Sequence, residues 1–468
     1  MEDSDKKDGF SRRDFLKTTA AGVGLAMTTG KLFGRPFLLT GAGQGRTVMP
    51  SDELRVALIG AGEQGRVLLD CCLRIPGIKI AALADIWEYS RNYASGYLNK
   101  YGQTPHVYED YKQLLNSEKD LDAVIIATPD WVHAEQANAC LNHGLPVYCE
   151  KEMSNSLDQA RTMVETARRT GRLLQIGHQR RSNPRYIHAI DKLLHERQII
   201  GRVMIGYAQW NRARAEMLSW PKKYTIPSEI LHRYGYNSME EFRNWRWFKK
   251  YGGGPIVDLG SHQIDLFSWA FKANPKSVVA SGGIDYYPQR EWYDNVMVIY
   301  EYDTPTGAAR AFYQVQTTTS HGGFYETFMG DNGSLVISEV PQRGDWAYRE
   351  AHAPDWAPLV REGLIRSEAP PIQKVQTKNV FVDVRVPLRL AAGRCPLNWL
   401  NLPISHTLKT FLRPSGEGCR LTARLSWLMS RQWRCLKSMK RSGTMLILNS
   451  ERKILKPEGH EIHEGRRI

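Results

Sequence analysis

The sequence contains few cysteines, and their spacing is not that of a disulfide framework or a zinc site. Its seven Cys residues are an odd number and include no CxxC pair, whereas metal sites and disulfide-rich domains use closely spaced cysteines. A free Cys inside a domain packs as a small hydrophobic group, and four lie in segments predicted to be buried: Cys71, Cys72, Cys140 and Cys149. The sequence therefore predicts neither a metal site nor a disulfide scaffold.

Long hydrophobic runs and a basic central region are also absent. No apolar stretch approaches the roughly 20 residues that span a bilayer. The net charge of +14 comes from the two ends, since residues 1–50 carry +3 and residues 386–468 carry +11, whereas residues 51–385 hold 39 basic and 39 acidic side chains. Nucleic-acid binding needs basic residues clustered on a folded surface. The charge pattern therefore argues against a nucleic-acid partner.

The N-terminal segment 1–50 has the features of an export signal. Arg12 and Arg13 precede Phe-Leu-Lys and a mildly hydrophobic stretch at 18–29, a pattern that resembles the bacterial twin-arginine signal. We expect the twin-arginine export machinery as a partner and a periplasmic or cell-envelope location. The alternative is an ordinary basic, amphipathic N-terminus, and in either case this segment is excluded from the predicted fold.

Residues 52–178 are predicted to form a Rossmann domain, a doubly wound parallel sheet. Continuous apolar runs such as 54–59 and 123–127 are typical of buried parallel strands, and helical patterns alternate with them. The other predicted strands are 78–83, 146–149 and 173–176, and the predicted helices are 65–73, 110–115, 134–142 and 157–170.

Residues 179–385 are predicted to form an α+β domain with a large, mainly antiparallel sheet. In this segment strand-like stretches follow one another with few helical patterns between them. The predicted strands are 201–210, 277–282, 295–302, 308–316 and 333–338. The length of 468 residues is sufficient for these two hydrophobic cores.

A glycine-rich turn with the pattern GxGxxG follows the first predicted strand and opens the first predicted helix. In this context the glycines allow a tight turn, a close approach to a pyrophosphate and close helix–strand packing, and the helix N-terminus attracts the phosphates. An acidic residue twenty positions later would bind the ribose hydroxyls and disfavour the 2′-phosphate of NADP. The alternative is a strand–turn–helix without a ligand. We assign NAD binding to Gly60, Gly62, Glu63, Gln64, Gly65 and Asp85.

Three further candidates for cofactor contact follow the predicted strand 123–127. Thr128 and Pro129 lie at its carboxyl end, where ligands bind in open α/β sheets. His133 comes after a short loop and is a candidate for the nicotinamide side. A helix-capping or solvent-exposed role is the alternative for His133.

Five motifs together resemble the glucose–fructose oxidoreductase/inositol dehydrogenase (Gfo/Idh/MocA) family. They are GAGEQG (60–65), ATPDWVH (127–133), CEKE (149–152), GGGPIVDLGSHQIDL (252–266) and GDNGS (330–334). The resemblance implies that Glu150 contacts the cofactor and that Lys151 lies in the active site, where it favours negative charge on the reacting oxygen. The sequence departs from the family at Glu152, where proline is usual. This change removes a fixed φ and adds a carboxylate beside the lysine.

The resemblance also implies that His262 is the general base that takes the hydroxyl proton. An ordinary imidazole pKa near 6.5 suits that task. Asp258 lies four residues earlier, hence on the same face if the segment is one helix, and would orient His262 or bind a neighbouring hydroxyl. His178 and Arg181 follow the last Rossmann strand and are candidates for substrate contact, with hinge packing as the alternative.

The resemblance implies an NAD(P)-dependent enzyme that transfers hydride between a sugar, cyclitol or polyol carbon and the nicotinamide. It also implies a homo-oligomer assembled through the sheet domain. One alternative is an enzyme that cleaves glycosides through transient sugar oxidation. Another is a non-catalytic dinucleotide-binding protein, although the presence of both Lys151 and His262 argues against it.

The last segment, 386–468, departs from the family pattern. Glu417 is its only acidic residue before position 451. When the third base of each codon is joined to the first two of the next, residues 410–417 can encode FFEAIRG, and residues 424–442 can encode an acidic, amphipathic helix. We therefore interpret the segment as the product of a reading-frame slip. It is predicted to be poorly ordered and to lack the native C-terminal helix, and the alternative is a divergent basic tail.

Overall fold

The computed structural model describes residues 53–340, 343–367, 391–394 and 448–449, the last two ranges as backbone only. The predicted export signal at 1–50 lies outside the described residues. So does the predicted altered tail from 386, apart from two short strands. None of the described helices has the length and apolar character of a bilayer-spanning segment, and the described residues contain no cluster of side chains that could hold a metal ion.

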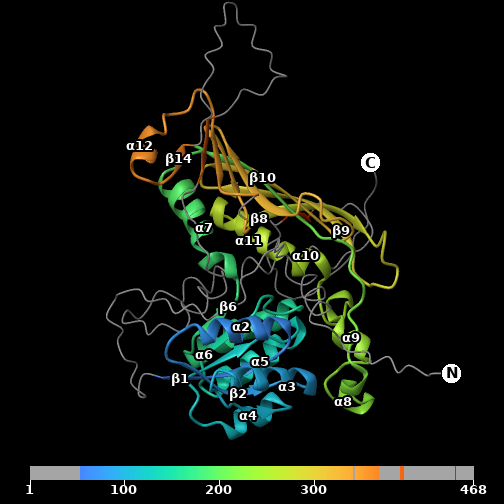
Figure 1. Cartoon of the computed structure of the whole chain (residues 1–468). Helices are drawn as coiled ribbons and strands as arrows, with labels where there is room; N and C mark the ends of the chain where they lie inside the picture. The colour runs from blue at the N-terminus through green and yellow to red at the C-terminus, as the bar shows by residue number, and fades with distance from the viewer. Residues whose placement is uncertain (1–52, 341–342, 368–390, 395–447, 450–468) are drawn as a thin grey trace, which may run out of the picture. The chain divides into compact units, whose positions relative to one another are not determined.

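The first domain contains a parallel sheet with the order β3-β2-β1-β4-β5-β6 (Figure 1). This confirms the predicted doubly wound fold. Its strands are β1 (Leu54–Ile59), β2 (Ile78–Ala84), β3 (His106–Tyr108), β4 (Ala123–Ile126), β5 (Val147–Cys149) and β6 (Leu174–Ile176). Its helices are α2 (Glu63–Leu73), α3 (Glu88–Asn99), α4 (Tyr111–Ser117), α5 (Asp130–Asn142) and α6 (Leu157–Thr170).

The central strands are buried on both faces, as their continuous apolar runs predict. Successive side chains point to opposite faces of a sheet, so Val56 and Leu58 belong to one hydrophobic core while Ala57 and Ile59 belong to another. Helix α3 and strand β3 were not predicted. Helix α3 buries only three small or apolar side chains, and β3 has only three residues, so both leave a weak pattern.

The second sheet has ten strands within the described residues, in the order β14-β15-β13-β12-β11-β7-β10-β9-β8-β16. Its pairs are antiparallel except for β7 with β10, which confirms the predicted mainly antiparallel sheet. Strands β11, β13 and β14 were not predicted, and β15 and β16 come from the segment predicted to be altered. The strands are β7 (Val203–Asn211), β8 (Pro275–Gly283), β9 (Asn295–Thr304), β10 (Gly307–Gln316), β11 (Phe324–Gly330), β12 (Gly333–Ile337), β13 (Trp346–Arg349), β14 (Arg366–Ser367), β15 (Ala391–Arg394) and β16 (Leu448–Asn449).

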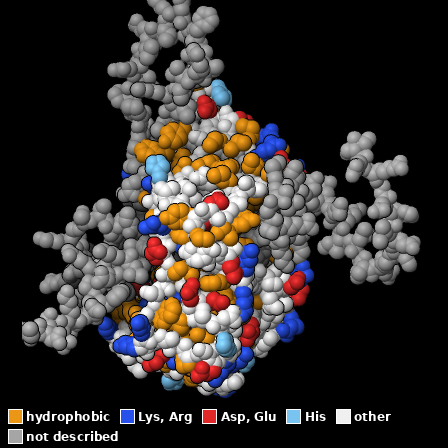
Figure 2. Space-filling view, turned by 90° about the vertical axis from the view of Figure 1, so that its right-hand side faces the viewer, with side chains coloured by type: hydrophobic (Ala, Val, Ile, Leu, Met, Phe, Trp, Pro, Cys, Tyr) orange, Lys and Arg blue, Asp and Glu red, His pale blue; other side chains and the backbone are white. Residues whose placement is uncertain are grey.

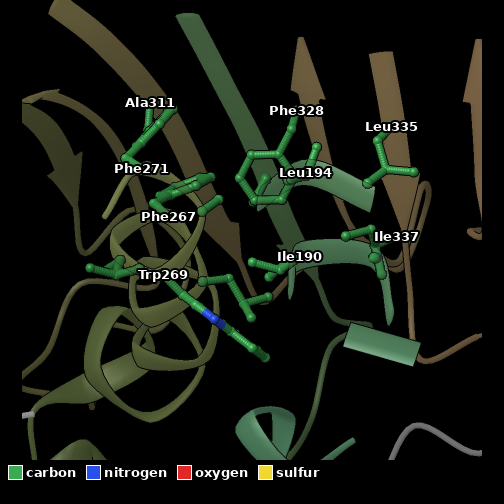
Figure 3. Close-up of a cluster of buried hydrophobic side chains, with 14 of the residues drawn as sticks. Ile190, Leu194, Phe267, Trp269, Phe271, Ala311, Phe328, Leu335 and Ile337 are labelled. Carbon is green, nitrogen blue, oxygen red and sulfur yellow. The ribbon is translucent and has the colours of Figure 1, made fainter. Parts of the chain in front are cut away.

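Helix α11 (Gly260–Phe271) packs against one face of this sheet, and all of its residues are buried. Figure 3 shows Phe267 and Phe271 of α11 beside Phe328 of β11, with Ile190 and Leu194 from a π-helical segment, η3 (Ile187–Glu196). The other helices of this region are η2 (Gln179–Ser182), α7 (Pro184–Tyr186), η4 (Lys222–Tyr224), α8 (Ser228–Arg233), α9 (Met239–Arg243), η5 (Trp245–Trp247), α10 (Gly254–Asp258) and α12 (Ala357–Arg361).

An aromatic cluster joins the segment between β7 and α10 to the Rossmann domain. The Trp87 indole donates a hydrogen bond to the Tyr224 carbonyl oxygen at 2.6 Å, and the Trp131 indole donates one to the Tyr236 hydroxyl at 3.1 Å. These contacts connect the loop after β2 and the first turn of α5 to the second domain. They therefore position the carboxyl edge of the parallel sheet beside α10 and α11.

Candidate active site

The glycine turn has the geometry that a dinucleotide site requires. Gly60 has a φ of +91°, which favours glycine, and a Cβ added to Gly65 would lie 2.0 Å from the Gly60 carbonyl oxygen. At Gly62 an added Cβ would meet no atom within 4 Å. The backbone before α2 is therefore tight where strand and helix meet and open where a pyrophosphate would approach.

Asp85 follows β2 and lies beside this turn. Its two carboxylate oxygens accept hydrogen bonds from the Ala61 and Trp87 N–H groups, both at 2.8 Å. Burial raises the pKa of Asp85, although these hydrogen bonds and the charges of Arg91 and Arg66 oppose the shift. Asp85 therefore lies where a ribose-binding carboxylate is expected. The positive charges of Arg91 and Arg66 lie nearby, so repulsion of the 2′-phosphate of NADP does not follow from Asp85 alone.

The remaining predicted cofactor residues connect loops at the same edge of the sheet. Pro129 immediately precedes α5, and the Thr128 hydroxyl donates a hydrogen bond to Gln136 at 2.7 Å. Glu150 is buried and accepts hydrogen bonds from the Gln64 side chain at 2.9 Å and the Tyr148 hydroxyl at 3.2 Å. Because Gln64 is in the first turn of α2, Glu150 connects the end of β5 to the glycine turn. Glu63, one residue earlier, is exposed.

His133 does not present a free ring nitrogen to the cofactor. Its Nδ1 lies 2.5 Å from the carbonyl oxygen of Glu152 and its Nε2 lies 2.7 Å from that of Thr128. The ring is completely buried, so the solvent-exposed alternative is wrong, and contact between His133 and the nicotinamide stays a prediction. His133 instead connects the loops that follow β4 and β5, and it thereby helps to position Lys151.

Lys151 reaches from the end of β5 to the end of α10. Its Nζ donates hydrogen bonds to the carbonyl oxygen of Asp258 at 2.8 Å and to Asp258 Oδ1 at 3.2 Å. Burial alone would lower the pKa of Lys151, but the carboxylates of Asp258, Glu152 and Asp130 outweigh burial and raise it. Lys151 is therefore a positively charged hydrogen-bond donor at neutral pH.

Asp258 positions Lys151 rather than His262. Helix α10 ends at Asp258 and α11 begins at Gly260, so the condition of one continuous helix is not met, and none of the described hydrogen bonds joins Asp258 to His262. Asp258 Oδ1 also lies 3.0 Å from Arg246 Nε. Burial would raise the pKa of Asp258, but the positive charges of Lys151, Arg246 and Arg212 hold it well below its usual range.

His262 is buried in the first turn of α11, with its ring centroid 5.7 Å from that of Trp210. Burial lowers the pKa of His262 well below 6.5, and the positive charges of Lys151 and Arg180 lower it further. The expectation of an ordinary pKa is therefore wrong. The ring is neutral at pH 7, in the form that can accept a proton.

The two predicted substrate contacts differ in their surroundings. His178 is buried among the charged side chains of the site, where it lowers the pKa values of His262, Glu152 and Asp265. Arg181 forms a two-pronged ion pair with Asp265, at 2.6 and 2.8 Å. Its guanidinium also lies 4.6 Å from the Trp269 ring centroid. These contacts favour the packing alternative for Arg181.

Comparison with known proteins identifies both domains. Residues 54–178 match the family model described as "Oxidoreductase family, NAD-binding Rossmann fold", and residues 226–336 match the GFO/IDH/MocA C-terminal domain. Together these matches span half of the chain. The chain belongs to the Gfo/Idh/MocA family of oxidoreductases.

Two curated relatives and one solved structure show the extent of the likeness. The chain is 36% identical over 216 residues to a 4-carboxy-2-hydroxymuconate-6-semialdehyde dehydrogenase from a Sphingobium species, covering 46% of this chain and 58% of that protein. It is 34% identical over 139 residues to an inositol 2-dehydrogenase from Rubrobacter xylanophilus, covering 29% and 38%. The crystal structure of myo-inositol 2-dehydrogenase from Lactobacillus plantarum has the same fold, with a TM-score of 0.53, 18% identity and coverage of 83% and 95%. The chain thus spans well under two thirds of the curated relatives' length.

Glu152, which replaces the usual proline of the Gfo/Idh/MocA motif, is buried next to the lysine. Its Oε1 lies 3.6 Å from Lys151 Nζ, and its backbone oxygen contacts His133. Burial raises the pKa of Glu152, while Lys151 and His178 lower it. The substitution therefore adds a second carboxylate to the lysine's surroundings without separating Lys151 from Asp258.

Sequence reasoning missed three charged side chains of this site. Asp130 begins α5, and burial raises its pKa to about 7 although Lys151 and Arg246 oppose the shift. Its position within the ATPDWVH motif is a signal that could have identified it. Arg246 and Arg212 contact or face Asp258, but both lie outside the quoted motifs, and only the folded chain brings them to the site.

Proposed function

We propose that this protein is an NAD-dependent oxidoreductase that acts on a hydroxyl carbon of a sugar, cyclitol or related polyol. The observation that carries the proposal is the hydrogen bond between a charged Lys151, which follows β5 of the Rossmann sheet, and Asp258, which lies four residues before a neutral His262. The name of one curated relative, inositol 2-dehydrogenase, supports a polyol substrate.

The charges of the two side chains suggest a separate catalytic role for each of them. Neutral His262 takes the proton of the substrate hydroxyl on a ring nitrogen, as a general base does. The Lys151 ammonium donates a hydrogen bond to the same oxygen and stabilises its developing negative charge. Asp258 holds Lys151 in place by accepting two hydrogen bonds from its Nζ. Bound NAD supplies the hydride acceptor, and the residues at 60–65, Asp85 and Glu150 would hold it.

The test uses the full chain with NAD and a panel of neutral polyols, including myo-inositol and glucose. We expect absorbance at 340 nm to rise with at least one of them. Lys151→Met and His262→Asn should each lower kcat by about 10²–10⁴-fold, the usual contribution of a positioned proton-transfer group. Arg214→Gln is the matched control, because the Arg214 side chain is 61% exposed and lies outside the site.

The other outcomes separate the alternatives. Release of nitrophenol from nitrophenyl glycosides without net NADH formation would identify a glycoside-cleaving enzyme instead. NAD binding without either reaction would identify a non-catalytic dinucleotide-binding protein. Unchanged turnover in Lys151→Met and His262→Asn would contradict the proposed mechanism.

We also propose that residues 1–50 direct export by the twin-arginine route, which transports folded proteins and so allows NAD to be bound before export. Arg12→Lys together with Arg13→Lys should retain the protein in the cytoplasm, as measured by cell fractionation. Periplasmic accumulation of the double variant would contradict this proposal.

The outer face of the second sheet supports self-association. Large hydrophobic side chains on it are exposed although they alternate with buried ones, namely Ile205, Met297, Ile299 and Met329. Figure 2 shows hydrophobic side chains gathered on the upper part of one side of the molecule. Exposed apolar patches of this kind often mark interfaces. Met297→Asp should reduce the mass measured by light scattering, and an unchanged mass would argue against this interface.

A further inference from the structure

Arg212 places a guanidinium group at the edge of the proposed active site. It directly follows β7, and its N–H donates a hydrogen bond to the Gln316 carbonyl oxygen at 2.9 Å. Because side chains alternate along a strand, Arg212 is on the same face as Trp210. Its guanidinium lies 5.4 Å from the Trp210 ring centroid. Trp210 in turn contacts His262, so Arg212 belongs to the α11 side of the sheet, where the catalytic residues lie.

The guanidinium of Arg212 differs from those of its neighbours because no carboxylate in the described part of the chain forms an ion pair with it. Arg180 pairs with Glu326 and Glu339, Arg181 pairs with Asp265, and Arg246 pairs with Asp258. Arg212 has a ring contact with Trp210, and none of the described hydrogen bonds involves its side chain. An arginine that is half-buried without an anion is unfavourable, which indicates a partner that binds here.

The balance of charges around Asp258 also favours an anionic ligand. This single carboxylate faces three cations, Lys151, Arg246 and Arg212. The neighbouring acids Asp130 and Glu152 act on Lys151, whose pKa both raise, and within the described residues neither forms an ion pair with Arg212.

We propose that Arg212 binds a carboxylate group of the substrate, so that the protein acts on a sugar acid or a comparably carboxylated polyol. This inference rests on the proposed oxidoreductase function and specifies its substrate class. The planar guanidinium matches a carboxylate with two parallel hydrogen bonds. A single unpaired arginine suits a carboxylate better than a phosphate group, because phosphate sites usually converge several donors on three oxygens.

The experiment compares glucuronate with glucose on the full chain, using the wild type, Arg212→Gln and Arg212→Lys. Binding to the NADH-loaded protein is measured by titration calorimetry, and turnover is measured at 340 nm with NAD. Because a hydrogen bond to a charged group is lost, Arg212→Gln should weaken glucuronate binding and lower its kcat/KM roughly 10- to 100-fold. Glucose binding should change little. Arg212→Lys should recover part of the loss, since it restores the charge without the planar fork.

Arg214→Gln is the matched control, because it makes the same substitution two residues away on an exposed side chain. Equal losses for glucuronate and glucose in Arg212→Gln would overturn the proposal. Tighter binding of glucose 6-phosphate than of glucuronate would also overturn it, since the anion would then be a phosphate. NAD affinity and the thermal midpoint of each variant show whether the protein is folded.

The binding and turnover measurements separate the two hypotheses. If glucuronate binds in an Arg212-dependent manner but no NADH forms with any compound, the oxidoreductase function fails while the carboxylate site stands. If NADH forms with neutral polyols and glucuronate neither binds nor reacts, the carboxylate site fails while the oxidoreductase function stands.

Discussion

Asp258→Asn removes the one carboxylate in the described part of the chain that directly pairs with both Lys151 and Arg246, and its effect on stability can be estimated from the structure. Asp258 and Lys151 side chains are 21% and 13% exposed, and their charged atoms are 3.2 Å apart. At an effective dielectric constant of about 20, such a pair attracts with about 5 kcal/mol before desolvation is subtracted. The Arg246 side chain is 44% exposed, so solvent screens its contribution.

Removal of one partner of a buried ion pair leaves the other charge uncompensated and usually costs about 3–5 kcal/mol. We therefore expect Asp258→Asn to lower the free energy of unfolding at pH 7 by that amount. The folded-state pKa of Asp258 is depressed, so its contribution is fully present above the unfolded value of about 3.9 and is lost as the pH falls toward the folded value. The difference between wild type and variant should accordingly shrink below about pH 4.

Urea unfolding followed by tryptophan fluorescence measures this difference. Asp303→Asn is the matched control, because Asp303 forms a 2.8 Å ion pair with Lys276 while 69% exposed, and such pairs contribute at most about 1 kcal/mol. The loss of Lys151's anchor should also lower kcat by about 100-fold, as displacement of a reacting group does. A stability loss no larger than that of Asp303→Asn would refute the buried-pair reasoning.

Three further predictions concern the cofactor turn, the general base and the tail. Gly65→Ala should destabilise the protein by about 1–3 kcal/mol, as overpacking does, because the added Cβ would lie 2.0 Å from the Gly60 carbonyl oxygen. Gly62→Ala, by contrast, should leave the unfolding midpoint unchanged and weaken NAD binding measured by calorimetry. Equal effects of the two variants would show that Gly62 does not face the cofactor. The depressed pKa of His262 predicts that kcat/KM stays constant from pH 8 down past 6.5 and falls only at lower pH, and an acid limb centred at or above 6.5 would contradict its role as the base. Replacement of residues 386–468 by the alternative reading frame should raise the thermal midpoint, and an unchanged midpoint, or an intact frame on resequencing, would end that hypothesis.

Strands were predictable where the local sequence has a continuous apolar pattern. They were missed where a buried charged residue interrupts that pattern and a residue far away in the sequence neutralises the charge. The runs 54–59 and 123–127 predict buried strands because both of their faces are apolar. Strand β11 was missed because Glu326 interrupts its apolar pattern at a buried position. In the folded chain Arg180 and the Tyr186 hydroxyl satisfy that carboxylate, at 2.5 and 2.8 Å.

By itself, the order of residues determined the parallel sheet and the glycine turn, because both depend on short-range patterns along the chain, whereas Lys151 and His262 were singled out through the motifs that resemble the Gfo/Idh/MocA family. Tertiary structure alone decided how these groups behave. Lys151 meets Asp258 across 107 positions of the chain, and Arg246 and Arg212 approach the same carboxylate from other loops. Burial then shifts the protonation of His262 and Asp130. Electrostatic energy depends on distance through space and on exclusion of water, and neither quantity can be obtained from spacing along the chain.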